Sequence, residues 1–162
     1  MHHKQISFPL MLIAGILIVT GSLVFAQGSE DVTSDLRVYK VELDKNKKEI
    51  LSLADQAKPG DILEYQVLYG NKGKSDVFNL RAILPIPEGL SYLQDTASPS
   101  LVEASLDGQK FDRVPLKRIV KRPDGTLMEE NVPYSEYRYL GWQIGQLNAG
   151  KNVQAKARMI LK

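Results

Sequence analysis

The sequence contains no cysteine, and its two histidines, His2 and His3, stand at the extreme N-terminus. Residues 27–162 therefore lack the side chains most used as general bases near neutral pH, as thiol nucleophiles and as transition-metal ligands. No disulfide can stabilise the fold, so stability must come from packing. Carboxylates, lysines, tyrosines and serines remain as reactive groups. An enzyme is thus the minority interpretation, and we expect no cofactor and no metal.

Neither sign of charge dominates, because 21 basic residues stand against 19 acidic ones. A mixed, near-neutral surface lacks the basic footprint of nucleic-acid-binding proteins, and we expect no nucleic-acid partner.

A long apolar run covers residues 8–25, follows Lys4 and ends in Val24-Phe25-Ala26. This pattern predicts an export signal over residues 1–26, cleaved before Gln27, and hence a periplasmic or extracellular protein. The alternative is an uncleaved membrane anchor, because about 20 apolar residues span a bilayer. Contact with a membrane is expected only through this segment.

The clearest strand signal follows the turn residues Pro59-Gly60-Asp61. From there every second residue is apolar and faces one side, namely Leu63, Tyr65, Val67 and Tyr69. Asn71 and Gly73 are expected to end the strand in a tight turn, because both tolerate positive φ.

Further strands are predicted over residues 36–43, 77–84, 90–93, 138–144 and 153–161, with a short edge strand over 50–54. In the second of these, we expect Phe78, Leu80, Ala82 and Leu84 to face inward. Asp107-Gly108 predicts a two-residue hairpin turn, and Pro123-Asp124-Gly125 predicts a second hairpin joining 116–121 to 126–130. No helical period appears after residue 26. The fold class is therefore all-β, an antiparallel β-sandwich over residues 35–162 after a flexible lead-in, 27–34.

Several short motifs follow one another along the chain, each occurring once: residues 35–40, Pro59-Gly60-Asp61, Asn71, Gly73, Asn79-Leu80, Ile86-Pro87-Glu88-Gly89-Leu90, Trp142, Ile144-Gly145 and Ala149-Gly150. In this order the chain resembles the bacterial conserved-repeat family known as domain of unknown function eleven. The resemblance implies an immunoglobulin-like sandwich of about seven core strands in an exported or surface protein. It also marks residues 105–139 as an inserted pair of hairpins, and Leu84 as a departure from the family's usual acidic residue.

The densest basic cluster is Lys117, Arg118, Lys121 and Arg122. It is a candidate contact surface for an acidic polysaccharide or a phospholipid headgroup. The alternative, which we favour, is that these side chains pair across the hairpin with Glu129 and Glu130.

Tyr137 and Tyr139 fall on the strand face opposite Leu140 and Trp142, so at least one is expected to be exposed as part of a contact surface. Trp142 itself is expected in the core rather than as a sugar-stacking platform. Asp107 and Asp124 are explained by turn chemistry and predict no calcium site.

Two reactive arrangements are weaker hypotheses. Lys40 is a candidate for an isopeptide bond, with Asn79 and Glu64 as conceivable partners. Asp112 and Glu136 are a candidate carboxylate pair for hydrolysis, without a supporting motif.

The sequence thus favours a non-catalytic, exported module of the cell envelope, with a structural or interaction role and an envelope or surface protein as partner. The alternative is a binding protein for envelope glycans or anionic surfaces that uses the basic hairpin and the tyrosines. Specificity is expected in the insertion 116–134, because loops on a rigid sheet carry binding and can be removed without unfolding it.

Overall fold

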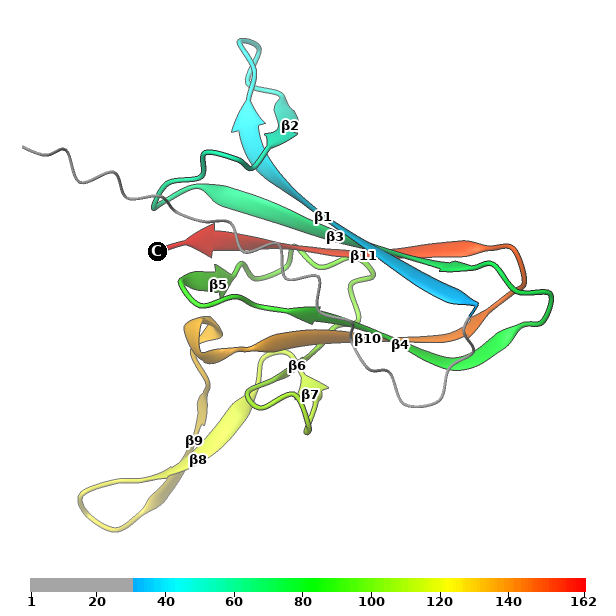
Figure 1. Ribbon diagram of the computed structural model, residues 1–162. Coiled ribbons are helices and arrows are strands. Elements are labelled where there is room, and N and C mark those ends of the chain that lie inside the picture. Colours follow the sequence, from blue (N-terminus) through cyan, green and yellow to red (C-terminus); the bar gives the residue numbers. More distant parts are fainter. Residues whose placement is uncertain (1–30) are drawn as a thin grey trace, which may run out of the picture.

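The computed structural model describes residues 31–162, so the predicted export signal and the first part of the lead-in lie outside the described residues. The fold is all-β, with two antiparallel sheets and a projecting hairpin (Figure 1). Its one helical element in this range is a 3-10 turn, η1, Tyr134–Glu136. Accordingly, no helix between residues 31 and 162 has the length and apolar character needed to cross a bilayer.

Residues 31–162 form eleven strands. The five-stranded sheet has the order β2 (Glu49–Leu53), β1 (Val32–Leu43), β3 (Ile62–Asn71), β11 (Asn152–Leu161), β5 (Leu90–Tyr92). The four-stranded sheet has the order β4 (Val77–Pro85), β10 (Tyr139–Leu147), β6 (Glu103–Ser105), β7 (Asp112–Arg113). The hairpin consists of β8 (Lys117–Lys121) and β9 (Leu127–Asn131).

The predicted all-β fold with two antiparallel sheets is confirmed, including the short edge strand, which is β2. The first strand begins earlier than expected: Val32, Thr33 and Ser34 pair with β3, so these residues are not a flexible lead-in. The strand order also differs from the immunoglobulin pattern, in which the last two strands share a sheet. Here β10 pairs with β4 and β11 pairs with β3, in different sheets.

The core lies between the two sheets and follows the predicted alternation. Trp142 lies at the centre of this core and is 1% exposed, and its indole Nε1 donates a hydrogen bond to the Pro99 carbonyl at 2.8 Å. The predicted core position of Trp142 is therefore confirmed. The facing strands supply both large and small buried side chains, among them Leu63, Tyr65, Val67, Tyr69, Leu140, Ala155, Ala157 and Met159.

The expected inward face of β4 is correct for Ala82 and Leu84, which are buried, and wrong for Phe78, which is 64% exposed. The cause is an irregular stretch of the β4–β10 ladder, where the register shifts on both sides of Gly145. Asn79 and Gly145 both have positive φ there, at 58° and 78°. A bulge of this kind breaks the period of two, so alternation no longer assigns the face.

Asn71 and Gly73 do end β3, but not because of positive φ. Asn71 is buried, and its amide donates to the carbonyls of Ser75 and Leu147 at 2.9 and 3.0 Å and accepts from the Gly73 N–H. Gly73 is required by close approach, because a Cβ there would lie 2.5 Å from a carboxylate oxygen of Asp31. The turn thus depends on the hydrogen bonds of the buried Asn71 amide and on the lack of room for a side chain at Gly73.

The Asp107-Gly108 hairpin is present but longer than predicted. Strands β6 and β7 pair over only two residues each, and the connection runs from residue 106 to 111. Asp107 Oδ1 accepts hydrogen bonds from the N–H groups of Gln109 and Lys110 at 2.8 and 3.1 Å. The aspartate therefore organises a wide loop rather than a two-residue turn.

Replacing Trp142 by Ala should lower the free energy of unfolding by about 3–5 kcal/mol, because it removes the largest buried side chain and leaves a cavity. Trp142→Phe is the matched control: it retains an aromatic ring but loses the bond to Pro99, and it should cost clearly less. Urea denaturation followed by far-ultraviolet circular dichroism measures both. A Trp142→Ala protein that unfolds at the wild-type midpoint would place the ring outside the core.

Replacing Asn71 by Ala should cost about 2–4 kcal/mol, because the Ser75 and Leu147 carbonyls lose a donor inside the fold. The neighbouring Lys72→Ala substitution, at an exposed position, serves as the control and should lie within about 0.5 kcal/mol of wild type. Chemical denaturation gives both values. Equal midpoints for the two variants would show that the amide bonds contribute nothing to stability.

Candidate functional site

The β8–β9 hairpin extends away from the sandwich and is anchored at its base (Figure 1). Leu116 and Val132, the residues that flank the two strands, are buried in the core. The Val132 N–H donates to the Leu116 carbonyl at 2.8 Å, and the Leu116 N–H donates to the Tyr137 hydroxyl at 2.7 Å. The hairpin is therefore mounted on the core rather than tethered by a loose linker.

Two of the four predicted basic residues are neutralised across this hairpin. Lys117 Nζ lies 2.6 Å from Glu129 Oε1, and Arg118 Nε lies 2.8 Å from Glu130 Oε1. Arg118 also contacts Glu136 Oε2 at 2.8 Å, and its hydrogen bond with Glu130 raises its pKa. The favoured prediction of pairing with Glu129 and Glu130 is confirmed for Lys117 and Arg118 only, so the base of the hairpin is not a basic patch.

Lys121 and Arg122 stand nearer the turn, and neither takes part in an ion pair within the described part of the chain. Arg122 Nη2 instead contacts Met128 Sδ at 2.6 Å. The predicted Pro123-Asp124-Gly125 turn is present, with Asp124 Oδ1 accepting from the Thr126 N–H at 2.9 Å. The same strands expose two large apolar side chains, Ile119 at 62% and Leu127 at 71%.

Tyr137 was expected at an exposed contact surface, and this is wrong. It is fully buried, stacks on Tyr92 at 6.4 Å and meets Tyr134 edge-on at 5.3 Å. The residue precedes β10 and follows the 3-10 turn, so the alternation of the strand does not apply to it. Tyr139 is half-buried against Gly108, where an added Cβ would lie 2.9 Å from its ring.

The expected partners of Lys40 are not beside it. Lys40 Nζ lies 3.1 Å from Asp61 and 3.3 Å from Glu42, and these contacts, with Asp61 first, raise its pKa. Glu64 is the β3 residue opposite Tyr39, so it lies on the other face of the sheet. Asn79 belongs to the four-stranded sheet.

The carboxylates of Asp112 and Glu136 form no pair with each other. Asp112 lies 3.0 Å from Lys110, and Glu136 binds Arg118. Each carboxylate is thus held by its own cation, which leaves the hydrolase hypothesis without its pair of acids.

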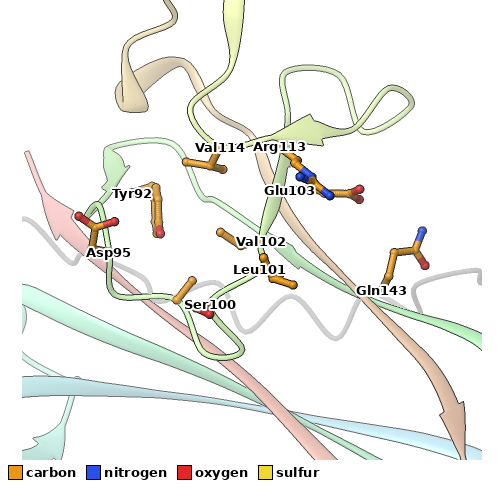
Figure 2. Close-up of a pocket in the computed structure, with 10 residues that line it drawn as sticks. Tyr92, Asp95, Ser100, Leu101, Val102, Glu103, Arg113, Val114 and Gln143 are labelled. Carbon is orange, nitrogen blue, oxygen red and sulfur yellow. The ribbon is translucent and has the colours of Figure 1, made fainter.

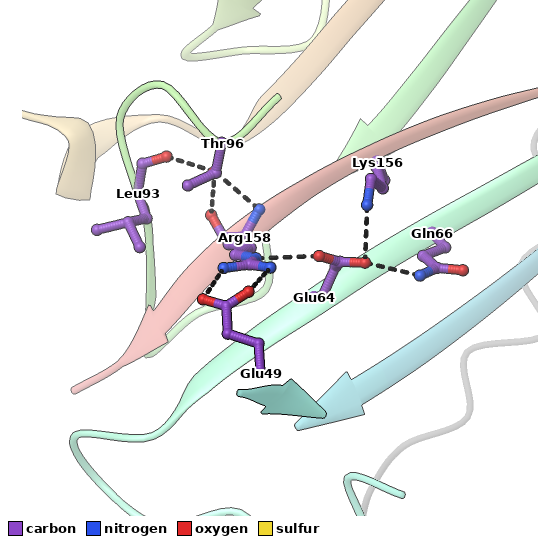
Figure 3. Close-up of polar contacts among 7 residues, drawn as sticks. All are labelled: Glu49, Glu64, Gln66, Leu93, Thr96, Lys156 and Arg158. Atoms are coloured by element: carbon purple, nitrogen blue, oxygen red, sulfur yellow. Dashed lines mark hydrogen bonds and ion pairs between the residues drawn. The ribbon is translucent and has the colours of Figure 1, made fainter. Parts of the chain in front are cut away.

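Sequence reasoning missed a buried carboxylate on the outer face of the five-stranded sheet (Figure 3). The side chain of Glu64 is only 3% exposed and accepts from Arg158 Nε at 3.0 Å, Lys156 Nζ at 3.3 Å and Gln66 Nε2 at 2.7 Å. Arg158 continues to Glu49 on β2 with two bonds of 2.9 and 2.7 Å. Strand β11 places Lys156 and Arg158 opposite Gln66 and Glu64, and the sequence alone does not show that β11 and β3 are neighbours.

Burial works to raise the pKa of Glu64, but hydrogen bonds from Gln66, Arg158 and Lys156 together outweigh it and lower the pKa. The bond to Arg158 likewise lowers the pKa of Glu49. Both groups are therefore charged at neutral pH. They act as a brace across strands β2, β3 and β11 rather than as proton donors.

A groove of about 410 Å³ opens where the β5–β6 connection, β6, β7 and β10 meet (Figure 2). Tyr92 and Val102 are its buried wall, and Asp95, Glu103 and Arg113 contribute polar groups. Asp95 and Glu103 lie at opposite ends of the groove, and Glu103 is ion-paired with Arg81. The groove does not bring two carboxylates face to face, as acid–base hydrolysis of a glycoside requires.

Residues 31–162 contain no group of three or more acidic side chains arranged to hold a metal ion. The chain matches no protein-family model, no curated protein and no solved structure.

Glu64→Gln should lower the free energy of unfolding at pH 7 by about 2 kcal/mol, because Arg158 and Lys156 lose a buried charged acceptor. A depressed carboxyl pKa stabilises the fold above the unfolded value of 4.5, and that contribution disappears as pH falls through the folded pKa. The gap between wild type and variant should therefore close below about pH 4.

Denaturant titrations from pH 7 to pH 3 measure this gap. Glu49→Gln removes the exposed end of the same network and is the control, with a smaller loss at pH 7. A Glu64→Gln gap that stays constant over the whole pH range would show that the carboxylate charge is not what stabilises the network.

Proposed function

We propose that this protein is a non-catalytic, exported interaction module of the cell envelope, and that the β8–β9 hairpin contacts its partner. The observation that carries the proposal is the exposure of Ile119 and Leu127 on a hairpin whose base is locked into the core. Exposed apolar side chains on a projecting, anchored element are typical of protein contact sites. The partner we propose is an envelope or surface protein.

The arrangement of charges supports a protein partner over a polyanion. Lys117 and Arg118 are matched by Glu129, Glu130 and Glu136, so the hairpin base is close to neutral. An apolar pair with matched charges at the hairpin base and Lys121 beside it resembles the anatomy of a protein interface, with its apolar centre and polar rim. The alternative is binding of envelope glycans or anionic surfaces. Of the basic residues predicted to contact such a ligand, only Lys121 and Arg122 remain outside the ion pairs of residues 31–162, and Tyr137 is buried.

A structural rather than catalytic role is supported by how the ionisable groups are used. Glu64, Asp112 and Glu136 are each held by a cation, and Lys40 is held by Asp61 and Glu42. Such pairs hold side chains in place, and for Glu64 they also lower the pKa, which is the opposite of what a general acid needs.

The proposed relationship to immunoglobulin-like surface domains is supported by the sandwich architecture and by the places that the shared motifs occupy. Asn71 and Gly73 form the first crossing between sheets, and Trp142 is the central core residue. The different sheets of β10 and β11 mark a variant strand order within that broad class. The export signal that the sequence predicts over residues 1–26 supports a location outside the cytoplasm.

The removable part of the insertion is shorter than 116–134, because Leu116 and Val132 belong to the core and Tyr134 packs on Tyr92. Arg118 and Glu130 form a hydrogen-bonded pair of the ladder, because the Val132 N–H donates to the Leu116 carbonyl and such pairs alternate. Residues 119–129 can therefore be replaced by Asn-Gly, which closes a two-residue hairpin. We expect this shortened protein to melt within a few degrees of wild type and to lose partner contact.

Contact is measured with a photo-crosslinking amino acid at position 127 of the full chain, illuminated in the expressing cell. Position 101 is the control, because Leu101 is also strongly exposed but lies by the groove on the other sheet. The proposal predicts a discrete adduct with a protein from position 127 and none from position 101. Equal adducts from both positions, or no adduct from position 127, would place the contact elsewhere.

A further inference from the structure

Among residues 31–162, strand β2 has a neighbour on one side only, β1. The hydrogen-bonding groups on its free edge can be assigned from the turn that precedes it. The Asp44 N–H donates to the Lys48 carbonyl at 2.8 Å, so residues 44 and 48 form a hydrogen-bonded pair. Such pairs alternate along an antiparallel ladder. Ile50 and Ser52 therefore bond to β1, and the N–H and C=O groups of Glu49, Leu51 and Leu53 point away from the sheet.

The ladder between β1 and β3 independently gives the same assignment of the backbone groups of β2. The Lys72 N–H donates to the Asp31 carbonyl at 2.9 Å, so odd-numbered residues of β1 bond to β3 and even-numbered ones bond to β2. Lys40 and Glu42 are opposite Ser52 and Ile50 in the β1–β2 ladder. The two observations agree on which groups of β2 are free.

The side chains of this edge are apolar and accessible. Leu51 is 44% exposed and Leu53 is 75% exposed, and Ile50 on the opposite face is also exposed. The one charged residue of β2, Glu49, is bound to Arg158 by two hydrogen bonds (Figure 3). These bonds hold β2 against the sheet, so its edge is presented in one fixed conformation.

Other edges in the described part of the chain carry devices that oppose strand addition. On β4, the Tyr69 hydroxyl bonds both the N–H and the C=O of Ile83, and Asn79 interrupts the strand with positive φ. Strand β11 is internal, and beyond its short neighbour β5 it is covered by Ser98, whose backbone exchanges two hydrogen bonds with Lys156 at 2.8 Å. Strands β8 and β9 are charged along their length. Edges treated in these ways resist pairing, and β2 lacks such protection.

We propose that β2 pairs with β2 of a second copy of this chain, antiparallel and centred on Leu51. In this register Leu51 faces Leu51 of the second copy, and Glu49 faces Leu53. These are the residues whose backbone groups are free, so each facing pair exchanges both N–H···O bonds. The edge is thus complementary to itself, which is the requirement for a two-fold dimer.

A five-residue strand buries less than the roughly 1,200–2,000 Å² of a standard interface, so we expect a weak dimer, with Kd on the order of tens of micromolar. The surface is separate from the β8–β9 hairpin and does not depend on the proposed function.

The absence of cysteine makes a direct test possible with the full chain. Leu51→Cys, treated with a short bismaleimide in the expressing cell, should give a covalent dimer of two copies. Leu101→Cys is the control, because its side chain is more exposed but lies on the other sheet, and it should give at least tenfold less. Comparable dimer from both variants, or an adduct of Leu51→Cys with a different protein, would overturn the proposal.

One further variant tests the ladder by sedimentation equilibrium. Leu51→Pro removes an N–H that faces the free edge and leaves the β1–β2 bonds intact, so it should melt like wild type and remain monomeric. A folded Leu51→Pro protein that still dimerises would contradict pairing centred on Leu51.

Discussion

The side-chain amide of Asn71 joins the two places where the chain passes between sheets at one end of the sandwich. It bonds Ser75 in the β3–β4 turn and Leu147 just before the β10–β11 turn. The backbone of the same residue bonds Lys151 and Gly150. Asp76 adds a second connection by accepting from Ala149 and Gln146. In a chain without disulfides, these bonds fix the relative position of the sheets, and packing around Trp142 can then become specific.

The polar ends of buried aromatic rings also hydrogen-bond backbone groups, as the Asn71 amide does, and they do so throughout the core. The Trp142 indole holds the Pro99 carbonyl, the Tyr69 hydroxyl holds Ile83, and the Tyr137 hydroxyl holds the base of the β8–β9 hairpin at Leu116. Each ring contributes apolar area and also satisfies a backbone group that the sheets leave unpaired. Irregular segments are in this way attached to the core. The projecting hairpin therefore has a defined direction, which an interaction module needs.

Much of the fold could be predicted from the sequence, because β3, β10 and β11 alternate cleanly and turn residues separate the strands. The prediction failed where the local sequence pattern does not match the tertiary structure. Phe78 faces outward because a bulge resets the alternation, and Tyr137 is buried because it lies before its strand begins. The pairing of Lys117 and Arg118 with glutamates was predictable, since hairpin register alone determines it. The Glu64 network was not, because it joins β2, β3 and β11 and depends on which strands are neighbours.

The directions of β1 and β11 have a mechanical consequence. Both strands flank β3 and run antiparallel to it, so Val32 lies at one end of the sheet and Leu161 at the opposite end (Figure 1). Tension applied between these two residues is directed along the strands. Ladder hydrogen bonds lie across that direction, so the load falls on many of them at once instead of opening them one after another. Glu64 and Arg158 connect β3 to β11 under the same load. The sheet is thus built to resist stretching in shear, a property suited to a domain under tension.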